Sequence, residues 1–167
     1  QPDQPSHLMA TYARQTISFV RGRGAYLYTE DGTEYLDALT GIAVCGLGHA
    51  HPVIAAAIAE QAATLVHTSN IYEIPWQTAA AQKLAEVSGM EEIFFSNSGA
   101  ESNEGAIKIA RKFGSQQGIA MPKIIVADQS FHGRTLATLS ATGNKKVQEG
   151  FAPLVDGFIR VPFGDIE

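Results

Sequence analysis

The sequence predicts an α/β fold organised around a mostly parallel sheet, and three apolar runs carry that prediction. Residues 123–127, a lysine and four apolar residues, form a run without alternation, which suits a strand covered on both faces. Shorter runs at residues 93–95 and 158–161 are further strand candidates, and segments with helical spacing separate the three. Because parallel neighbours need a long crossover connection, strands that alternate with helices imply parallel βαβ units.

An antiparallel hairpin is expected before this sheet. Tyrosines lie on both sides of residues 30–33, whose Asp-Gly pair between alternating apolar residues is a strong hairpin signal. Residues 41–52 contain three glycines and two histidines and have the composition of a loop.

Apolar spacing and helix breakers predict four helices. The first begins at Pro52 and has the spacing of a helix with one buried face. The second covers residues 76–87 and stops before a glycine, and the third includes the apolar positions of residues 106–113. A short helix is expected after Gly133.

The composition excludes several functional classes. Hydrophobic residues make up 45% of the 167, which indicates a globular chain, and the net charge of −5 argues against a nucleic-acid partner. No apolar run approaches the roughly 18 residues of a membrane span, and the first residues lack the regions of a signal peptide. The lone Cys45 excludes an internal disulfide; we expect a buried core thiol and a cytoplasmic protein.

A turn of small residues, Ser98-Gly99-Ala100, stands between an expected strand and an expected helix. The first N–H groups of a helix have no partner within it, and together with the helix dipole they form an anion site. Gly99 has no Cβ, so a phosphate could approach the backbone closely. The spacing from Ser98 to Glu101 fits a plain capping box equally well, and it leaves both interpretations open.

Longer segments resemble a known family. Residues 97–104 and 131–135 closely resemble the class III aminotransferases, which have pyridoxal-phosphate fold type I. Further matching segments are residues 35–37, 41–44, 47–52, 67–70 and 161–165. Within the class, the resemblance is closest to the acetylornithine aminotransferases.

The resemblance implies a cofactor, pyridoxal 5'-phosphate, and residues that hold it. Ser98, Gly99 and Ala100 would bind the phosphate. Phe131 would lie against one face of the pyridine ring, and His132 would sit beside it and orient the site. The alternative for Phe131 is a core aromatic residue at the end of a strand.

The resemblance also implies substrate-binding residues. Arg134 would grip the α-carboxylate of the substrate with its planar guanidinium, the alternative being a surface salt bridge. Tyr12 lies where relatives have a tyrosine near the substrate entrance. The family's Schiff-base lysine and the acid that faces the ring nitrogen lie downstream of Glu167, so this chain alone is expected to be inactive.

A truncated two-domain arrangement follows from the same resemblance. Residues 1–50 are expected to contribute to a small domain, and residues 51–167 to form the first part of the large cofactor-binding domain. Residues 163–167 read as a loop and a helix cap without a helix, so we expect a piece of a longer chain. Relatives are homodimers, and a homodimer is expected here.

Two positions favour one substrate. Ornithine δ-aminotransferases usually have an aromatic residue near position 42 and a tryptophan beside the stacking phenylalanine, where this chain has Ile42 and His132. Ile42 offers no hydroxyl to a free amino group, and this favours N-acetylornithine as amino donor. The acceptor would be 2-oxoglutarate, which yields glutamate, in arginine biosynthesis. Ornithine and succinylornithine stay open as alternative substrates.

Other classes of protein fit the sequence less well. A non-catalytic phosphate-binding α/β module would explain Ser98 but would leave Phe131 and Arg134 idle. No G-x-G-x-x-G motif follows a predicted strand, which argues against a dinucleotide-binding oxidoreductase. His49 and His51 lack a third ligand nearby, so structural histidines are expected and no metal site.

Overall fold

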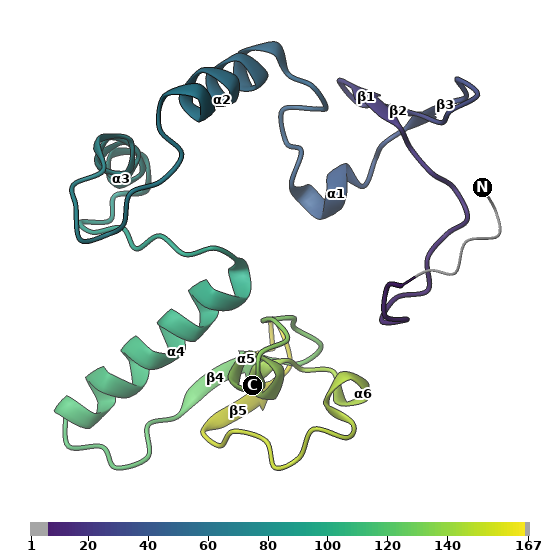
Figure 1. Ribbon diagram of the computed structural model, residues 1–167. Helices are drawn as coiled ribbons and strands as arrows, with labels where there is room; N and C mark the ends of the chain where they lie inside the picture. Colours follow the sequence, from purple (N-terminus) through teal and green to yellow (C-terminus); the bar gives the residue numbers. More distant parts are fainter. Residues whose placement is uncertain (1–6, 166–167) are drawn as a thin grey trace. The chain divides into compact units, whose positions relative to one another are not determined.

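A computed structural model describes residues 7–165, and its contacts divide the chain into two units (Figure 1). The first unit is Gln1–Ile74 and the second is Pro75–Glu167. The described part of the first unit holds a three-stranded antiparallel sheet, and that of the second holds a two-stranded parallel sheet. The division expected at residue 50 concerns domains of the whole protein and stays a prediction.

Three short strands form the first sheet, in the order β1 (Arg21–Arg23), β2 (Tyr26–Tyr28) and β3 (Glu34–Leu36). Tyr28 lies opposite Arg21 on one side and Glu34 on the other. The Arg21 guanidinium lies 4.2 Å from the centre of the Tyr28 ring. The Tyr28 hydroxyl donates to Glu34 Oε2 at 2.7 Å, and this bond raises the pKa of the tyrosine. The predicted hairpin is confirmed between β2 and β3, whereas β1 was missed because Arg-Gly-Arg shows no apolar alternation.

A left-handed turn follows the hairpin where the sequence predicted only a loop. All four residues of α1 (Thr40–Ala43) have positive φ, at 52°, 66°, 62° and 61°. Left-handed backbone costs an ordinary residue about 1–2 kcal/mol, and a residue branched at Cβ, such as Ile42, fits it least. The N–H groups of Val44 and Cys45 close the turn by donating to the Thr40 carbonyl, each at 2.9 Å.

The helix expected from Pro52 is confirmed as α2 (Pro52–Thr64), with the proline in its first turn. Its expected buried face is not found, because no residue of α2 is buried and Val53 and Ile58 are both exposed. The apolar spacing therefore identified the helix correctly, but no described element of the first unit covers it.

The second unit confirms the parallel sheet. In β4 (Ile124–Ala127) and β5 (Phe158–Val161), Ile124 lies opposite Phe158 and Ala127 opposite Val161. The helices of this unit are α3 (Pro75–Ser88), α4 (Gly99–Gln116), α5 (Leu136–Ala141) and α6 (Lys145–Gln148). The three helices expected after residue 75 correspond to α3, α4 and α5, and α4 precedes β4 along the chain as Figure 1 shows.

The core of the second unit lies around α5. Its buried side chains come mainly from α4, β4 and α5, and they are Ile107, Val126, Thr138, Leu139, Ser140, Ala141 and Thr142. The buried hydroxyls are satisfied: Ser140 Oγ donates to the Leu136 carbonyl at 2.6 Å and accepts from Val155 N at 2.8 Å. Because an unpaired buried polar group is costly, this bonding makes a partly polar core tolerable.

Side chains from α6 and β5 satisfy the end of α5, whose last carbonyls have no partner within the helix. Gln148 Nε2 donates to the carbonyls of Leu139 and Thr142 at 3.0 and 2.8 Å. The Arg160 guanidinium also donates to the Thr142 carbonyl, at 3.1 Å. The Thr142 hydroxyl in turn accepts from His132 N at 3.1 Å, so this network fixes the loop that follows β4.

Two further expectations are wrong. Residues 93–95 are not a strand, because no described strand lies beside them to accept and donate ladder hydrogen bonds. Cys45 is half-buried, so it is not a core thiol.

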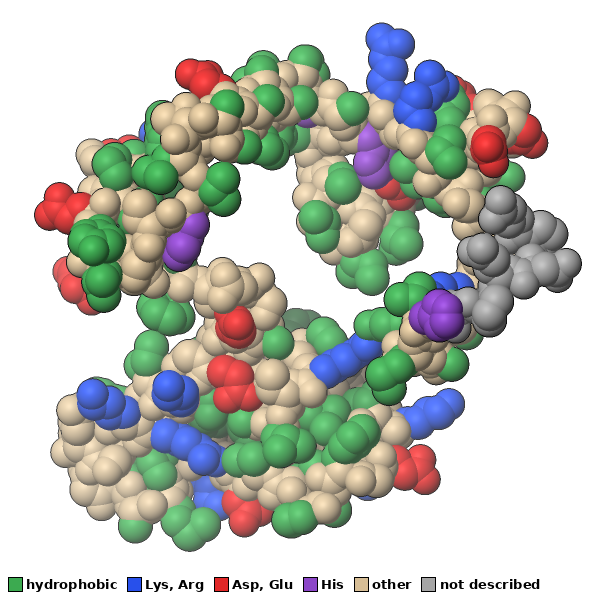
Figure 2. Space-filling view, viewed as in Figure 1, with side chains coloured by type: hydrophobic (Ala, Val, Ile, Leu, Met, Phe, Trp, Pro, Cys, Tyr) green, Lys and Arg blue, Asp and Glu red, His purple; other side chains and the backbone are tan. Residues whose placement is uncertain are grey.

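Exposed apolar side chains are spread over the surface in Figure 2. They include Trp76, Phe113 and Phe163 in the second unit and Val66 in the first. Within residues 7–165, no helix is both long and apolar enough to cross a membrane.

Candidate functional site

Ser98 caps the start of α4. Ser98 has extended backbone, and its Oγ accepts from Glu101 N at 3.2 Å. The Glu101 carboxylate turns back and accepts from both Asn97 N and Asn97 Nδ2, at 2.6 and 2.9 Å. Ser98 is therefore confirmed as the N-cap, but the box is incomplete, because Glu101 bonds Asn97 N and not Ser98 N.

Capping leaves room for an anion. The Ser98 side chain satisfies only the Glu101 amide, and the N–H groups of Gly99 and Ala100 have no acceptor among the described residues. A Cβ built on Gly99 meets nothing within 4 Å, so the space beside this backbone is open. Ser98 Oγ accepts one bond and still has its own proton to donate. The two interpretations of the turn are thus compatible.

The loop after β4 lies directly against this turn. A Cβ on Gly133 would lie 2.8 Å from Ala100 Cβ, a separation that real Cβ atoms essentially never show. Asn103 Nδ2 donates to the His132 carbonyl at 2.7 Å, and the Thr135 hydroxyl donates to a carboxylate oxygen of the α4 residue Glu104. These contacts join residues about thirty positions apart and bring the Ser98–Ala100 turn and the Phe131–Arg134 segment together.

His132 is held by its own hydrogen bonds. The Ser130 hydroxyl donates to the Ala127 carbonyl at 2.6 Å, and His132 Nε2 lies 3.0 Å from the same hydroxyl oxygen. Because the hydroxyl proton is already used, His132 Nε2 donates to that oxygen. This ring nitrogen therefore bonds within the loop itself, and the expected role of His132 beside the cofactor stays a prediction.

Phe131 and Arg134 point to the surface from the loop that follows the carboxyl end of β4. The Phe131 side chain is 68% exposed, so it is not the core aromatic residue that was the alternative. Arg134 is exposed as well. Ligands of parallel α/β sheets bind at this edge, where an open aromatic face and a cation can both reach them. The individual roles of these residues stay predictions.

Other candidates lie outside this cluster. Tyr12 belongs to the first unit, so its place relative to the cluster is undetermined and its role stays a prediction. His49 Nε2 lies 2.6 Å from Asp37 Oδ2, as a structural histidine would. That bond, with those from the N–H groups of Thr40 and Leu39, holds the pKa of Asp37 below its ordinary value. Among the described residues no group of His, Cys, Asp and Glu could hold a metal ion.

The sequence did not single out Asn103, Glu104, Thr138 or Thr142 as residues that support the site. Asn103 and Glu104 lie within a segment quoted for its resemblance, and that was the available signal. Thr142 gave no signal, because only the folded chain brings its hydroxyl to His132.

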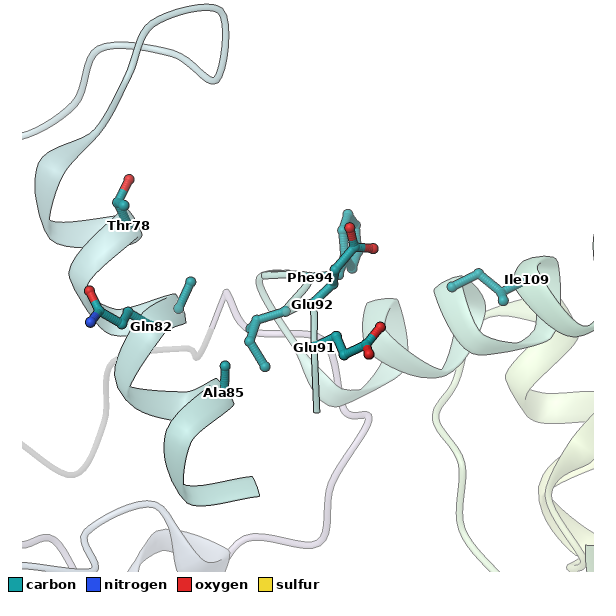
Figure 3. A pocket seen from close by; sticks show the side chains of 9 residues that line it. Thr78, Gln82, Ala85, Glu91, Glu92, Phe94 and Ile109 are labelled. Carbon is teal, nitrogen blue, oxygen red and sulfur yellow. The ribbon is translucent and has the colours of Figure 1, made fainter. Parts of the chain in front are cut away.

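A separate hollow of about 700 Å³ lies elsewhere in the second unit. Figure 3 shows Thr78, Gln82 and Ala85 of α3 on one side, with Phe94 and Ile109 across from them. None of its lining residues belongs to the Ser98–Ala100 turn or to the Phe131–Arg134 segment. This hollow is therefore not part of the candidate site.

Comparison with known proteins places this geometry in a family. The family model for class III aminotransferases matches residues 9–167. The chain is 58% identical over 162 residues to an acetylornithine aminotransferase of Nitrosomonas europaea, covering 97% of this chain and 41% of that protein. It is 57% identical over 162 residues to one of Gloeobacter violaceus, covering 96% and 40%. The chain thus spans about two fifths of the length of these curated relatives.

Solved structures agree with the sequence comparison. The chain is 30% identical to an ornithine aminotransferase from Toxoplasma gondii, with a TM-score of 0.91 over 95% of this chain and 38% of that one. An ω-transaminase from Pseudomonas jessenii in complex with PMP is also 30% identical, with a TM-score of 0.79 over 87% and 33%. The predicted α/β fold with a parallel sheet is therefore confirmed as an aminotransferase fold. The chain belongs to the class III aminotransferases.

Proposed function

We propose that the whole protein is a pyridoxal-phosphate-dependent transaminase that moves the δ-amino group of N-acetylornithine to 2-oxoglutarate, in arginine biosynthesis. The observation that carries this proposal is the contact between the Ser98–Ala100 turn and the Phe131–Arg134 segment. The free amides of the turn would bind an anion there, beside a loop that carries an exposed aromatic ring and an arginine. The high identity to acetylornithine aminotransferases supports the substrate.

The residues present fit the cofactor. The free N–H groups of Gly99 and Ala100, the Ser98 hydroxyl and the positive end of α4 would hold the phosphate. Phe131 would cover one face of the pyridine ring. When bound, the cofactor supplies an electron sink for the substrate carbon next to the transferred amino group.

Two side chains of the loop after β4 would act beside the pyridine ring of the cofactor, one by positioning Phe131 and one by binding the substrate. His132, fixed by Ser130 and by the Thr142 hydroxyl, would keep Phe131 in register with the phosphate turn. Arg134 would bind the α-carboxylate that N-acetylornithine and 2-oxoglutarate share. The lysine that completes the reaction is proposed to lie outside residues 1–167.

Replacing Gly99 by alanine tests phosphate binding by the turn independently of helix capping. The added Cβ meets nothing in the chain, so Gly99→Ala should leave the free energy of unfolding unchanged or slightly higher. The same Cβ intrudes where the phosphate approaches, and losing one charged hydrogen bond of about 1.5–3 kcal/mol weakens cofactor affinity about 10- to 100-fold. Titration of the full-length apoprotein with pyridoxal phosphate measures this affinity.

Gly105→Ala is the matched control, because it lies on the same helix and its Cβ makes only ordinary contact with Phe94. It should keep wild-type cofactor affinity. If Gly99→Ala and Gly105→Ala bind the cofactor equally well, the turn is a cap alone and the phosphate site is wrong.

Full-length protein should transfer the amino group from N-acetylornithine faster than from ornithine. A substrate site bordered by Ile42 would give a free ammonium no hydrogen-bond partner there, and discrimination against such an unpaired polar group should exceed about tenfold in kcat/KM. Glutamate formed from 2-oxoglutarate, measured with each donor, checks the order. A preference for ornithine or succinylornithine would identify that compound as the amino donor. No transfer from any donor would favour the non-catalytic phosphate-binding module.

We also propose that the whole protein is cytoplasmic and forms a homodimer. Exposed apolar side chains such as Ile42, Val44 and Val66 support association, since large apolar surfaces mark interaction sites. Sedimentation of the full-length protein would give its mass directly, and a monomer would contradict the assembly.

A further inference from the structure

Residues 37–49 form a loop whose two ends meet at the turn between β1 and β2. Asp37 N donates to the Ala25 carbonyl at 2.8 Å, and His49 and Gly24 exchange two backbone hydrogen bonds at 2.8 and 3.0 Å. Gly22 allows His49 to pack closely, because a Cβ on Gly22 would lie 2.6 Å from His49 Cβ. A compact surface loop closed at its base in this way is an Ω-loop, a class that frequently carries function.

The Asp37 carboxylate connects the base of this loop with its first turn. Its Oδ1 accepts from Leu39 N and Thr40 N at 3.1 and 2.8 Å, and its Oδ2 pairs with His49 Nε2 at 2.6 Å. The side chain of Asp37 is only 7% exposed. One buried carboxylate therefore binds both the start of α1 and the far end of the loop.

The turn that Asp37 holds is strained. Four successive left-handed residues, Thr40–Ala43, include Ile42 at φ 62° and ψ 60°, which an L-residue branched at Cβ rarely adopts. Strained backbone of this kind persists only where surrounding structure over-determines it, and it clusters at functional sites.

Apolar packing does not hold the turn within the described chain. The large apolar side chains of the loop, Leu39, Ile42, Val44 and Leu47, are between 68% and 80% exposed. The remaining restraints are hydrogen bonds, and those of the Asp37 side chain are the ones that reach across the loop. Besides the backbone hydrogen bonds within the turn, the polar pair at the base of the loop therefore restrains its conformation.

We propose that Asp37 and His49 are positioning residues that fix the left-handed turn and thereby the direction of the Ile42 side chain. This inference rests on the proposed function, in which Ile42 discriminates between N-acetylornithine and ornithine. The pair touches neither substrate nor cofactor; it acts through the backbone of Thr40–Ala43. Loss of the pair should relax the turn, move Ile42 and reduce discrimination between the two donors.

Asp37→Ala in the full-length protein tests the pair with two measurements. The first is alkylation of Cys45 by iodoacetamide, followed by peptide mass spectrometry, because Cys45 N–H closes the turn and its half-buried thiol becomes accessible when the turn opens. Its rate should rise at least about threefold. The second is the KM of each donor. The KM of ornithine divided by that of N-acetylornithine should fall at least about threefold, while kcat for N-acetylornithine stays nearly unchanged.

Asp31→Ala is the matched control, because Asp31 also accepts bonds within a turn of this unit but has none to the loop. Unchanged Cys45 alkylation in Asp37→Ala relative to Asp31→Ala overturns the proposal, and so does faster alkylation with an unchanged KM ratio. If Asp37→Ala does not fold, Asp37→Asn, which keeps an oxygen for Leu39 and Thr40 but loses the charge opposite His49, should show smaller changes of the same sign. A wild-type protein that transfers no amino group refutes the proposed function instead, and Cys45 alkylation then still decides whether Asp37 holds the turn.

Discussion

Gly133→Ala should destabilise the protein and weaken its hold on the cofactor. The new Cβ would lie 2.6 Å from Thr138 Oγ1 and 2.8 Å from Ala100 Cβ, and Gly133 has a φ of 136° that an alanine rarely adopts. Overpacking costs about 1–3 kcal/mol and unfavourable backbone about 1–2 kcal/mol, so the free energy of unfolding should fall by about 2–5 kcal/mol. Denaturant unfolding of the full-length protein measures this loss.

The cofactor effect has a geometric cause. Thr138 is fully buried in α5 and cannot give way, so relief of the clash moves the loop away from Ala100. Such a shift separates the phosphate turn from Phe131, and affinity for pyridoxal phosphate should fall by about tenfold or more, since losing one hydrogen bond to a charged group suffices.

Gly150→Ala is the control for backbone strain alone. Gly150 has a φ of 83°, but a Cβ there meets nothing within 4 Å. The free energy of unfolding of this variant should fall by only about 1 kcal/mol, and its affinity for pyridoxal phosphate should stay unchanged. If Gly133→Ala loses no more stability than Gly150→Ala, then the close approach of the loop to Ala100 is wrong.

Arg134→Ala should raise KM for both carboxylate substrates in the full-length enzyme. N-acetylornithine and 2-oxoglutarate each carry an α-carboxylate, which a guanidinium binds through two parallel hydrogen bonds. Losing hydrogen bonds to a charged group at about 1.5–3 kcal/mol predicts a rise in KM of about 10- to 100-fold for each substrate. Steady-state kinetics with each substrate varied in turn measures the two values.

Two further variants distinguish carboxylate binding by the planar guanidinium of Arg134 from the effect of its positive charge. Arg134→Lys keeps the positive charge without the planar fork and should recover only part of the affinity. Lys108→Ala removes an exposed cation from α4 and should leave both KM values unchanged. Lost cofactor binding with unchanged KM values in Arg134→Ala would show that the arginine serves the cofactor and not the substrate.

Local sequence signals determined the elements that depend on nearby residues. The hairpin at residues 30–33, the helix from Pro52 and the cap at Ser98 each rest on bonds or backbone preferences within a few positions. The family resemblance was confirmed for the same reason: it depends on the order of residues and not on contacts. The unpartnered amides of Gly99 and Ala100 were also predictable, because the first amides of any helix lack partners within it.

Longer-range structure decided what local signals could not. Residues 93–95 have the composition of a strand, but a strand exists only beside a partner, and none lies there among the described residues. The apolar spacing after Pro52 specified a helix but not what covers it. The left-handed turn at residues 40–43 was hidden, since only one of its four residues is a glycine and a distant histidine helps to hold it.

The turn at Ser98-Gly99-Ala100 combines both kinds of information. The sequence by itself determined the cap, the free amides and the family. Only the tertiary structure brought Gly133 against Ala100 and Asn103 to the His132 carbonyl, about thirty positions along the chain. The physical reason is that a cap forms within one turn of helix, whereas these contacts exist only after α4 and α5 have packed against each other.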